Sequence, residues 1–335
     1  MKWNRWTKGG AAAALLLLVA SVVAWALVGG ERHEDSLLDS CGGSLAVDEA
    51  NGFFAGAELE SRGHTGEWVG HDVEYCSVSA RNDPDAGTLQ VQLRPAAAHR
   101  ASGAAEYPGA APLGYGWNGS FAVRGGPEAA VLVDCAPLAG KGLLVLVGTA
   151  KDARELTREQ IIAVARLTTE TARRAAERFH CEGVLGQRPD EVDTTGEAKR
   201  PVAGAIETCR GVVSAADART LGAVAVGEYR AGRSLTEECN VRLRQGGGLR
   251  INAYYGPSAQ QEMYLDARYP GSVKGIVTRT HTCPGGLGTT YFKITPPLLP
   301  DKQPVSFDGP EREALNALLV SFAEASAARH GCSLD

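Results

Sequence analysis

The strongest constraint on this sequence is that one ordered set of four cysteines occurs twice. The flanking residues repeat as well, because the first cysteines open C-G-G-S-L-A-V-D-E-A and C-R-G-V-V-S-A-A-D-A, and the second stand in E-Y-C-S-V and E-E-C-N-V. The two halves are therefore predicted to be copies of one domain. The eight positions are Cys41, Cys76, Cys135 and Cys181 in the first half and Cys209, Cys239, Cys283 and Cys332 in the second.

The length of 335 residues suits two domains. The charged stretch at 183–203 contains proline and glycine without an apolar period, which predicts a linker. We therefore place the first repeat at 34–182 and the second at 204–335. Each repeat is long enough to bury a hydrophobic core of its own.

Each repeat is predicted to run helix, strands, insert, strands, helix. Ser214 and Asp217 have the S-x-x-D spacing of a helix start, and T-R-E-Q gives a capping signal for the last helix of the first repeat. Segments such as T-L-Q-V-Q-L and C-N-V-R-L alternate as strands do. The irregular inserts fall at 96–116 and 256–272. This order predicts an α+β fold, in which each repeat is an antiparallel sheet packed with an N-terminal and a C-terminal helix.

Residues 11–30 are predicted to form a transmembrane helix. The run A-A-A-A-L-L-L-L-V-A-S-V-V-A-W-A-L-V has one polar side chain, and about 20 helical residues span a bilayer core. Basic residues precede the run and acidic residues follow it, so the positive-inside rule places residues 1–10 in the cytoplasm and the rest of the chain outside the cell membrane. The alternative is a cleaved signal peptide, since A-W-A near the end of the run matches A-x-A.

An even number of cysteines in an exported chain predicts disulfides. We favour bridges from the first cysteine to the second and from the third to the fourth of each repeat, because each bridge then holds a helix against a strand that it packs on. Bridges from the first to the fourth and from the second to the third stay open as the alternative. The favoured pairs are Cys41–Cys76, Cys135–Cys181, Cys209–Cys239 and Cys283–Cys332.

Several function classes are disfavoured. The net charge of −5 argues against nucleic acid, which needs clustered basic residues. The chain has no C-x-x-C of a zinc or redox site, and the G-x-G-x-x-G match at 114–119 precedes a strand-like S-F-A-V where a dinucleotide site needs a helix. The repeated positions are cysteine, glycine, helix caps and apolar residues, which belong to a scaffold. We therefore expect no enzyme, and no catalytic, cofactor-binding or metal-binding residues.

Aromatic side chains in irregular segments are the candidates for recognition, because aromatic residues on loops favour binding surfaces. Ordinary packing against the sheets is the alternative reading. The candidate ligand or partner contacts are Trp68, Tyr115, Trp117, Tyr254, Tyr255, Tyr264 and Tyr269.

The segment C-G-G-S-L-A-V-D-E-A-N-G-F-F, followed some 35 residues later by E-Y-C-S-V, resembles small actinobacterial cell-envelope domains. These comprise short lipoproteins of unknown function and the extracellular sensor domains of some serine/threonine kinases. The resemblance implies an α+β domain with disulfides paired first to second and third to fourth. The chain departs from the pattern because it has no lipobox, and because Ser77 and Asn240 stand where a tryptophan follows the second cysteine. Its cytoplasmic part is also too short for a kinase, so signalling across the membrane would need a partner.

We therefore expect a single-pass membrane protein that presents two disulfide-bonded domains outside the cell as a binding or sensing module of a bacterial envelope. Its expected partners are the membrane, through the N-terminal helix, and an envelope protein or a cell-wall ligand. The alternatives are an envelope scaffold that binds other membrane proteins and a secreted hydrolase.

Overall fold

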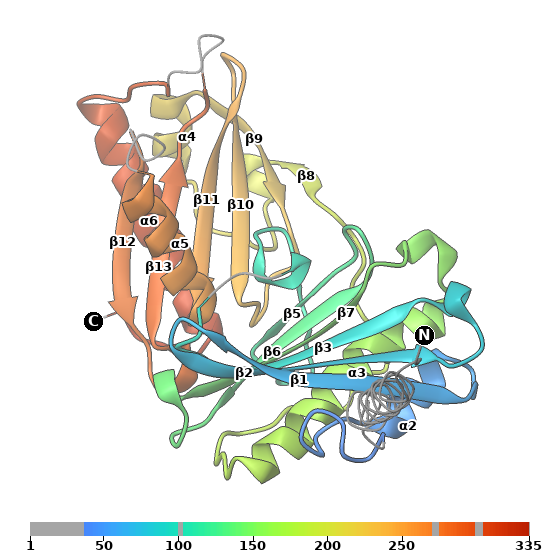
Figure 1. Cartoon of the computed structure of the whole chain (residues 1–335). Coiled ribbons are helices and arrows are strands. Elements are labelled where there is room, and N and C mark those ends of the chain that lie inside the picture. The colour runs from blue at the N-terminus through green and yellow to red at the C-terminus, as the bar shows by residue number, and fades with distance from the viewer. Residues whose placement is uncertain (1–36, 100–102, 270–274, 299–303, 335) are drawn as a thin grey trace, which may run out of the picture. The chain divides into compact units, whose positions relative to one another are not determined.

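Two antiparallel sheets, one from each half of the chain, form the framework of this computed structural model (Figure 1). The structure describes residues 37–99, 103–269, 275–298 and 304–334. Residues 36–335 form one compact unit. Five α-helices accompany the sheets within the described residues, so the predicted α+β class with antiparallel sheets is confirmed.

The first sheet has seven strands in the order β1-β2-β3-β7-β6-β5-β4. Alternate residues of its central strands are apolar, and they face the helices α2 and α3, which pack on each other as well. Thr157 caps α3 with Gln160 in the expected reciprocal pair of hydrogen bonds. The elements are α2 (Val47–Phe53), β1 (Leu59–Trp68), β2 (His71–Ala80), β3 (Thr88–Pro95), β4 (Ala111–Pro112), β5 (Gly119–Ala122), β6 (Glu128–Asp134), β7 (Gly142–Thr149) and α3 (Arg158–Arg178).

The second sheet has six strands in the order β12-β13-β11-β10-β9-β8. Helix α6 packs on β11, β12 and β13 and also contacts α4, whereas α5 lies on the other face of β11 and β13 (Figure 1). Ser214 caps α4 as expected, and Pro310 occupies the first turn of α6. The elements are β8 (Ala198–Pro201), α4 (Ala215–Leu221), β9 (Ala223–Glu228), β10 (Thr236–Leu243), β11 (Gly248–Tyr255), α5 (Pro257–Arg268), β12 (Val277–Thr282), β13 (Thr289–Thr295) and α6 (Pro310–Arg329).

The stretch predicted as a linker, 183–203, is not free along its whole length. Its last part forms β8, which pairs with β9 at the edge of the second sheet. Its first part is fastened to the first half, because Arg173 donates to the Gly186 carbonyl at 2.8 Å and Arg166 donates to the Pro189 carbonyl at 2.8 Å. Composition alone could not reveal these contacts, because the partners lie elsewhere in the sequence. They are the backbone of β9 and the side chains of two arginines of α3.

The two halves share a tightly packed junction. Leu132 and Leu144 of the first sheet belong to the same buried apolar cluster as the core of the second half. Close to them the Gly286 amide donates to the Asp134 carboxylate at 2.7 Å. A Cβ on Gly142 would lie 2.9 Å from the Gly286 Cα, so glycine is required for this approach.

Four disulfides join the cysteines, and they are the favoured pairs. Cα–Cα distances range from 4.3 to 5.6 Å. In the first half the bridges fasten the segment before α2 to β2, and the end of β6 to the residues after α3. The bridges are Cys41–Cys76, Cys135–Cys181, Cys209–Cys239 and Cys283–Cys332.

The predicted cytoplasmic tail at 1–10 and the predicted transmembrane helix at 11–30 lie outside the described residues. Among the helices that the structure does describe, none is long and apolar enough to cross a membrane.

Candidate binding cleft

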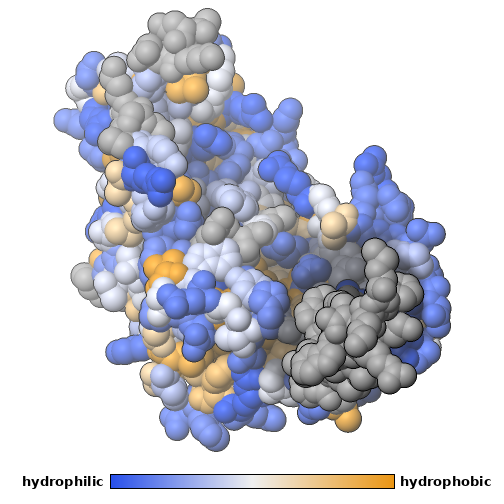
Figure 2. Space-filling view, viewed as in Figure 1, coloured by the Kyte–Doolittle hydropathy of each residue, from blue (hydrophilic) through white to orange (hydrophobic). Residues whose placement is uncertain are grey.

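Three adjoining pockets between the first-half insert, the segment 191–197 and the second half form the candidate site. Their volumes are about 460, 250 and 600 Å³. Asp193 lines the first two, and Tyr107, Arg124 and Tyr229 line the last two, so neighbouring pockets share walls. We call the three pockets together the cleft. Figure 2 shows that hydrophilic residues cover most of one face of the molecule.

One wall of the cleft is the polar face of the second sheet. Strand alternation turns Leu249, Ile251 and Ala253 of β11 into the core. The intervening Arg250 and Asn252 line the cleft on the opposite face. The alternation that builds the core therefore also builds a polar surface.

Across that wall, register sets Glu238, Asn252 and Lys293 side by side on three strands. The Asn252 amide donates to the Glu238 carboxylate at 3.1 Å, and Asn240 donates to the same carboxylate at 2.7 Å. Two neutral amides thus satisfy Glu238, and its charge remains in the cleft.

Helix α5 brings two further carboxylates to this wall. Lys293 forms ion pairs with Glu262 and, at 3.2 Å, with Asp266. The Tyr291 hydroxyl also donates to Asp266, at 2.8 Å. Burial and this hydrogen bond raise the pKa of Tyr291, so its hydroxyl stays protonated and a donor.

Tyrosine rings dominate the aromatic lining. Tyr107 and Tyr269 are 51% and 54% exposed, whereas Tyr254 is buried at the base. Burial first, and then the charge of Glu262, raise the pKa of Tyr254 well above its ordinary value. Burial likewise raises the pKa of Tyr229. Tyr254 and Tyr229 therefore present neutral phenols at neutral pH.

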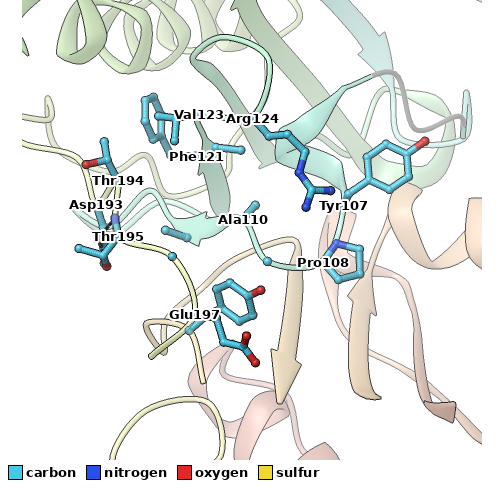
Figure 3. Close-up of a pocket in the computed structure, with 15 residues that line it drawn as sticks. Tyr107, Pro108, Ala110, Phe121, Val123, Arg124, Asp193, Thr194, Thr195 and Glu197 are labelled. Atoms are coloured by element: carbon cyan, nitrogen blue, oxygen red, sulfur yellow. Dashed lines mark hydrogen bonds between the residues drawn. The ribbon is translucent and has the colours of Figure 1, made fainter. Parts of the chain in front are cut away.

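Two arginines reach the cleft from the two halves. Arg124 follows β5, and Figure 3 shows its guanidinium pointing towards the segment of Tyr107 and Pro108. Arg250 stands on β11 of the second sheet. Both side chains are exposed and line the largest pocket.

The Tyr107 segment is held in place by a buried ion pair. Arg94 at the end of β3 pairs with Glu106, and both side chains are fully buried. Glu106 ends the short 3₁₀ helix η2 (Ala104–Glu106), directly before Tyr107. The Tyr107 carbonyl also accepts from the Thr236 hydroxyl at 2.7 Å. The Arg94–Glu106 pair therefore positions one wall of the cleft.

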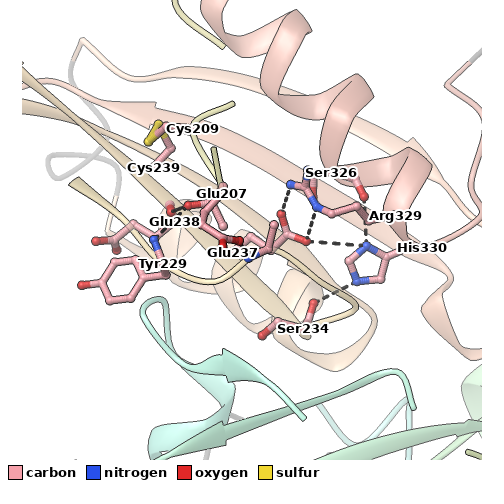
Figure 4. A network of polar contacts seen from close by, with 12 residues as sticks. Glu207, Cys209, Tyr229, Ser234, Glu237, Glu238, Cys239, Ser326, Arg329 and His330 are labelled. Atoms are coloured by element: carbon pink, nitrogen blue, oxygen red, sulfur yellow. Dashed lines mark hydrogen bonds and ion pairs between the residues drawn. A yellow bond between two sulfur atoms is a disulfide. The ribbon is translucent and has the colours of Figure 1, made fainter. Parts of the chain in front are cut away.

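A second polar network lies where the end of α6 meets the second sheet (Figure 4). Buried Glu237 pairs with Arg329. The His330 ring nitrogens face the carbonyl oxygens of Ser326, at 3.0 Å, and Ser234, at 2.9 Å. Because both neighbours are carbonyls, this imidazole has no hydroxyl to activate. Within the described ranges, no three His, Cys, Asp or Glu side chains are grouped to hold a metal ion.

No protein-family model, no curated protein and no solved structure matches this chain.

The predicted contact residues separate into two groups. Tyr254 and Tyr269 line the largest pocket, and Tyr115 and Trp117 line the pocket beside Asp193. Trp117 is itself buried, and its indole donates to the Gln187 carbonyl at 2.8 Å. Trp117 therefore packs beneath the pocket surface and holds the segment of Gln187 in place, and it is not an exposed contact residue.

The other three lie outside the cleft pockets. Trp68 ends β1, and Tyr264 is exposed on α5, where its hydroxyl accepts from Arg268 at 2.6 Å. Tyr255 is fully buried against α6, with its hydroxyl 2.6 Å from that of Ser326. Alternation along R-I-N-A-Y-Y could have assigned it to the core, because Tyr255 shares the face of Ile251.

Sequence reasoning missed Tyr107, Tyr229, Arg124 and Arg250. The alternation of β11 carries a signal for Arg250, since it falls on the same face as Tyr254. The other three stand in short connecting segments with no periodicity, so only the tertiary packing brings them together.

Proposed function

We propose that this chain is a non-catalytic binding or sensing module, anchored in a bacterial cell membrane by residues 11–30 and exposed outside the cytoplasm. Its ligand lies in the cleft. We further propose that its halves are duplicated copies of one domain, related to the actinobacterial envelope domains that the cysteine pattern resembles. Four disulfides fit an oxidising, extracytoplasmic location.

The observation that carries the proposal is the cleft itself. Tyr107, Tyr229 and Tyr269 come from three separate segments and line one polar pocket of about 600 Å³. Pockets lined by aromatic rings with a few directed polar groups are typical ligand sites. A scaffold that recruits proteins would instead favour an extended apolar surface.

Two observations favour binding over hydrolysis. The buried His330 faces two carbonyl oxygens where a hydrolytic triad needs a nucleophilic hydroxyl. The duplicated sequence positions are cysteines, glycines, helix caps, apolar residues and one glutamate, Glu74 or Glu237, that pairs with an arginine in each half. Neither the surroundings of His330 nor the duplicated positions supply a general base next to a nucleophile.

The test is cosedimentation of the full-length chain, in detergent, with the insoluble wall of the cell that makes it. We expect the wild-type chain to sediment with the wall. The double variant Y107S/Y269S should bind about tenfold more weakly, because it removes two rings from the cleft. Both side chains are more than half exposed, so the substitutions spare the fold.

The matched control is Y264S, which removes a 46% exposed tyrosine of α5 from outside the cleft pockets. It should bind as the wild type does. Equal binding by the wild type and Y107S/Y269S, or no wall binding at all, would reject the cleft as the wall-binding site. Crosslinking to membrane proteins that survives Y107S/Y269S would favour the scaffold function.

A further inference from the structure

Two guanidinium groups of the cleft have no hydrogen-bond or ion-pair partner in the described part of the chain. Arg124 and Arg250 both line the 600 Å³ pocket, and neither has a hydrogen-bond or ion-pair partner among the described residues. They come from different halves, so no local helix or turn explains why they line the same pocket. The pocket's remaining cation, Lys293, is already paired with Glu262 and Asp266.

The carboxylates of the 250 and 600 Å³ pockets, in contrast, all have hydrogen-bond or ion-pair partners. Glu197 accepts from Asn240 at 3.0 Å, and Asp193 accepts from Thr195 and lies 3.7 Å from Arg230. Glu238, Glu262 and Asp266 have the partners described above. Among the charged groups that line these two pockets, only Arg124 and Arg250 lack a hydrogen-bond or ion-pair partner within the described residues.

Unmet hydrogen-bonding capacity surrounds these arginines. The hydroxyls of Tyr107, Tyr229 and Tyr254 have no protein partner within the ranges that the structure describes. Tyr107 and Tyr229 line the same two pockets as Arg124. A tyrosine offers an apolar ring and a polar hydroxyl, which are the two kinds of surface that a sugar ring contacts.

We propose that Arg124 and Arg250 form the subsite for the carboxylate or phosphate of an acidic saccharide, whose sugar rings lie against Tyr107 and Tyr229. The inference rests on the proposed binding function of the cleft and names its ligand class. A guanidinium binds carboxylate and phosphate oxygens in a bidentate manner, which fixes both position and orientation.

The charges of the cleft also limit how acidic the ligand is. Five carboxylates line the two pockets on either side of Arg124, and Glu238 is satisfied by neutral amides alone. A polyanion would meet these carboxylates along most of its length. A saccharide with one anionic group among neutral rings would place that group between the arginines and avoid the repulsion.

The experiment is isothermal titration calorimetry of the full-length chain in detergent with two matched probes. One is a tetrasaccharide of three N-acetylglucosamine residues and a single glucuronate, and the other is the neutral tetramer of N-acetylglucosamine. We expect the acidic probe to bind about tenfold more tightly at low salt, which corresponds to one charge-assisted hydrogen bond. Its preference should shrink in high salt.

The variant R124Q/R250Q should abolish this preference and leave the affinity for the neutral tetramer unchanged. The control R279Q removes an exposed arginine of β12 that lies outside the cleft pockets, and it should keep the preference. Glucose 6-phosphate and glucuronate, titrated separately, distinguish a phosphate from a carboxylate as the preferred anion.

Equal affinities for the two tetrasaccharides, or a preference that persists in R124Q/R250Q, would overturn the subsite. Tighter binding of polyglutamate than of either saccharide would overturn the ligand class. Cell-wall binding that depends on Tyr107 and Tyr269 would survive each of these results, so failure of the subsite is distinguishable from failure of the binding function.

Discussion

The imidazole of His330 lies on the phenol ring of Tyr255, with the ring centroids 3.7 Å apart and the planes inclined by 22°. Both side chains are buried between α6 and the second sheet. Glu237 lies 3.9 Å from the imidazole, and Arg329 neutralises that carboxylate from the other side. His330 is thus a titratable group enclosed in the core of the second half.

This burial predicts a loss of stability in mild acid. Desolvation lowers the pKa of His330 below its ordinary value of 6.5, and the charge of Glu237 offsets this only in part. As the pH falls, His330 therefore binds a proton at a higher pH in the unfolded chain than in the folded chain. The stabilisation is fully present above pH 6.5 and is lost as the pH falls through the lower folded pKa.

Urea unfolding at pH 7.5 and pH 5.5 measures this effect. The free energy of unfolding of the wild type should be lower at pH 5.5 than at pH 7.5. The difference should be smaller in H330Q. H64Q removes an exposed imidazole that stacks on Tyr75, and it should behave as the wild type. An equal fall in the wild type and H330Q would show that other groups cause the pH dependence.

The buried pair Arg94–Glu106 predicts a large effect from a single substitution. R94M leaves the Glu106 carboxylate buried without its guanidinium, which should cost roughly 3–5 kcal/mol of unfolding free energy. R94M/E106L removes both charges and should recover most of that loss. Ligand binding in the cleft should weaken in R94M too, because Glu106 positions Tyr107.

The comparison for that prediction is the exposed pair of Arg81 and Glu58, 2.7 Å apart. R81M should cost at most about 1 kcal/mol, since solvent screens exposed ion pairs. Urea denaturation followed by tryptophan fluorescence reports both variants. If R94M lost as little unfolding free energy as R81M, the structure around Glu106 would have relaxed so that water solvates its carboxylate.

The close approach of Gly142 and Gly286 predicts that a single methyl group disturbs the junction between the halves. G142A places its Cβ 2.9 Å from the Gly286 Cα and 3.0 Å from the Ala96 Cβ, and backbone atoms cannot rotate away. Gly142 has extended backbone angles that alanine adopts freely, so the cost is steric. We expect a loss of about 1–3 kcal/mol in thermal or urea unfolding.

The glycine control is Gly52, exposed in α2 with no atom within 4 Å of an added Cβ. G52A should leave stability unchanged or raise it by about 1 kcal/mol, because alanine is the better helix former. If G142A had the same stability as G52A, the junction between the halves would be more loosely packed than these distances indicate.

The bridge Cys283–Cys332 predicts a loss of about 4 kcal/mol in the double variant C283A/C332A. It closes a separation of 49 residues and so restricts the unfolded chain strongly. Unfolding under non-reducing conditions measures the loss, and peptide mapping checks that the other three bridges remain. Unchanged stability would indicate that the unfolded chain is already compact.

Local patterns in the sequence sufficed for the scaffold. Capping pairs such as Thr157 with Gln160 involve neighbours three residues apart, and they form wherever the helix starts. The favoured disulfide pairs, which rested on holding a helix to its strand and on the resemblance to envelope domains, are the ones that the structure forms. Strand alternation accounts for the residues of β11 that face the core, and by the same rule Tyr255, predicted from the sequence to lie on a binding surface, belongs to the core.

The site depended on contacts that no local pattern specifies. Composition made 183–203 a linker, yet 198–201 completes the second sheet because the edge strand β9 offers unpaired backbone groups. Arg124 and Arg250 are 126 positions apart in the printed sequence and reach one pocket because the junction at Gly142 and Gly286 brings the two halves together. The sequence by itself determined the class of fold and the helix starts at Thr157 and Ser214, since these rest on short-range chemistry, whereas it left two disulfide pairings open. The tertiary structure alone decided the cleft, because its walls are the polar faces left over once both cores are packed.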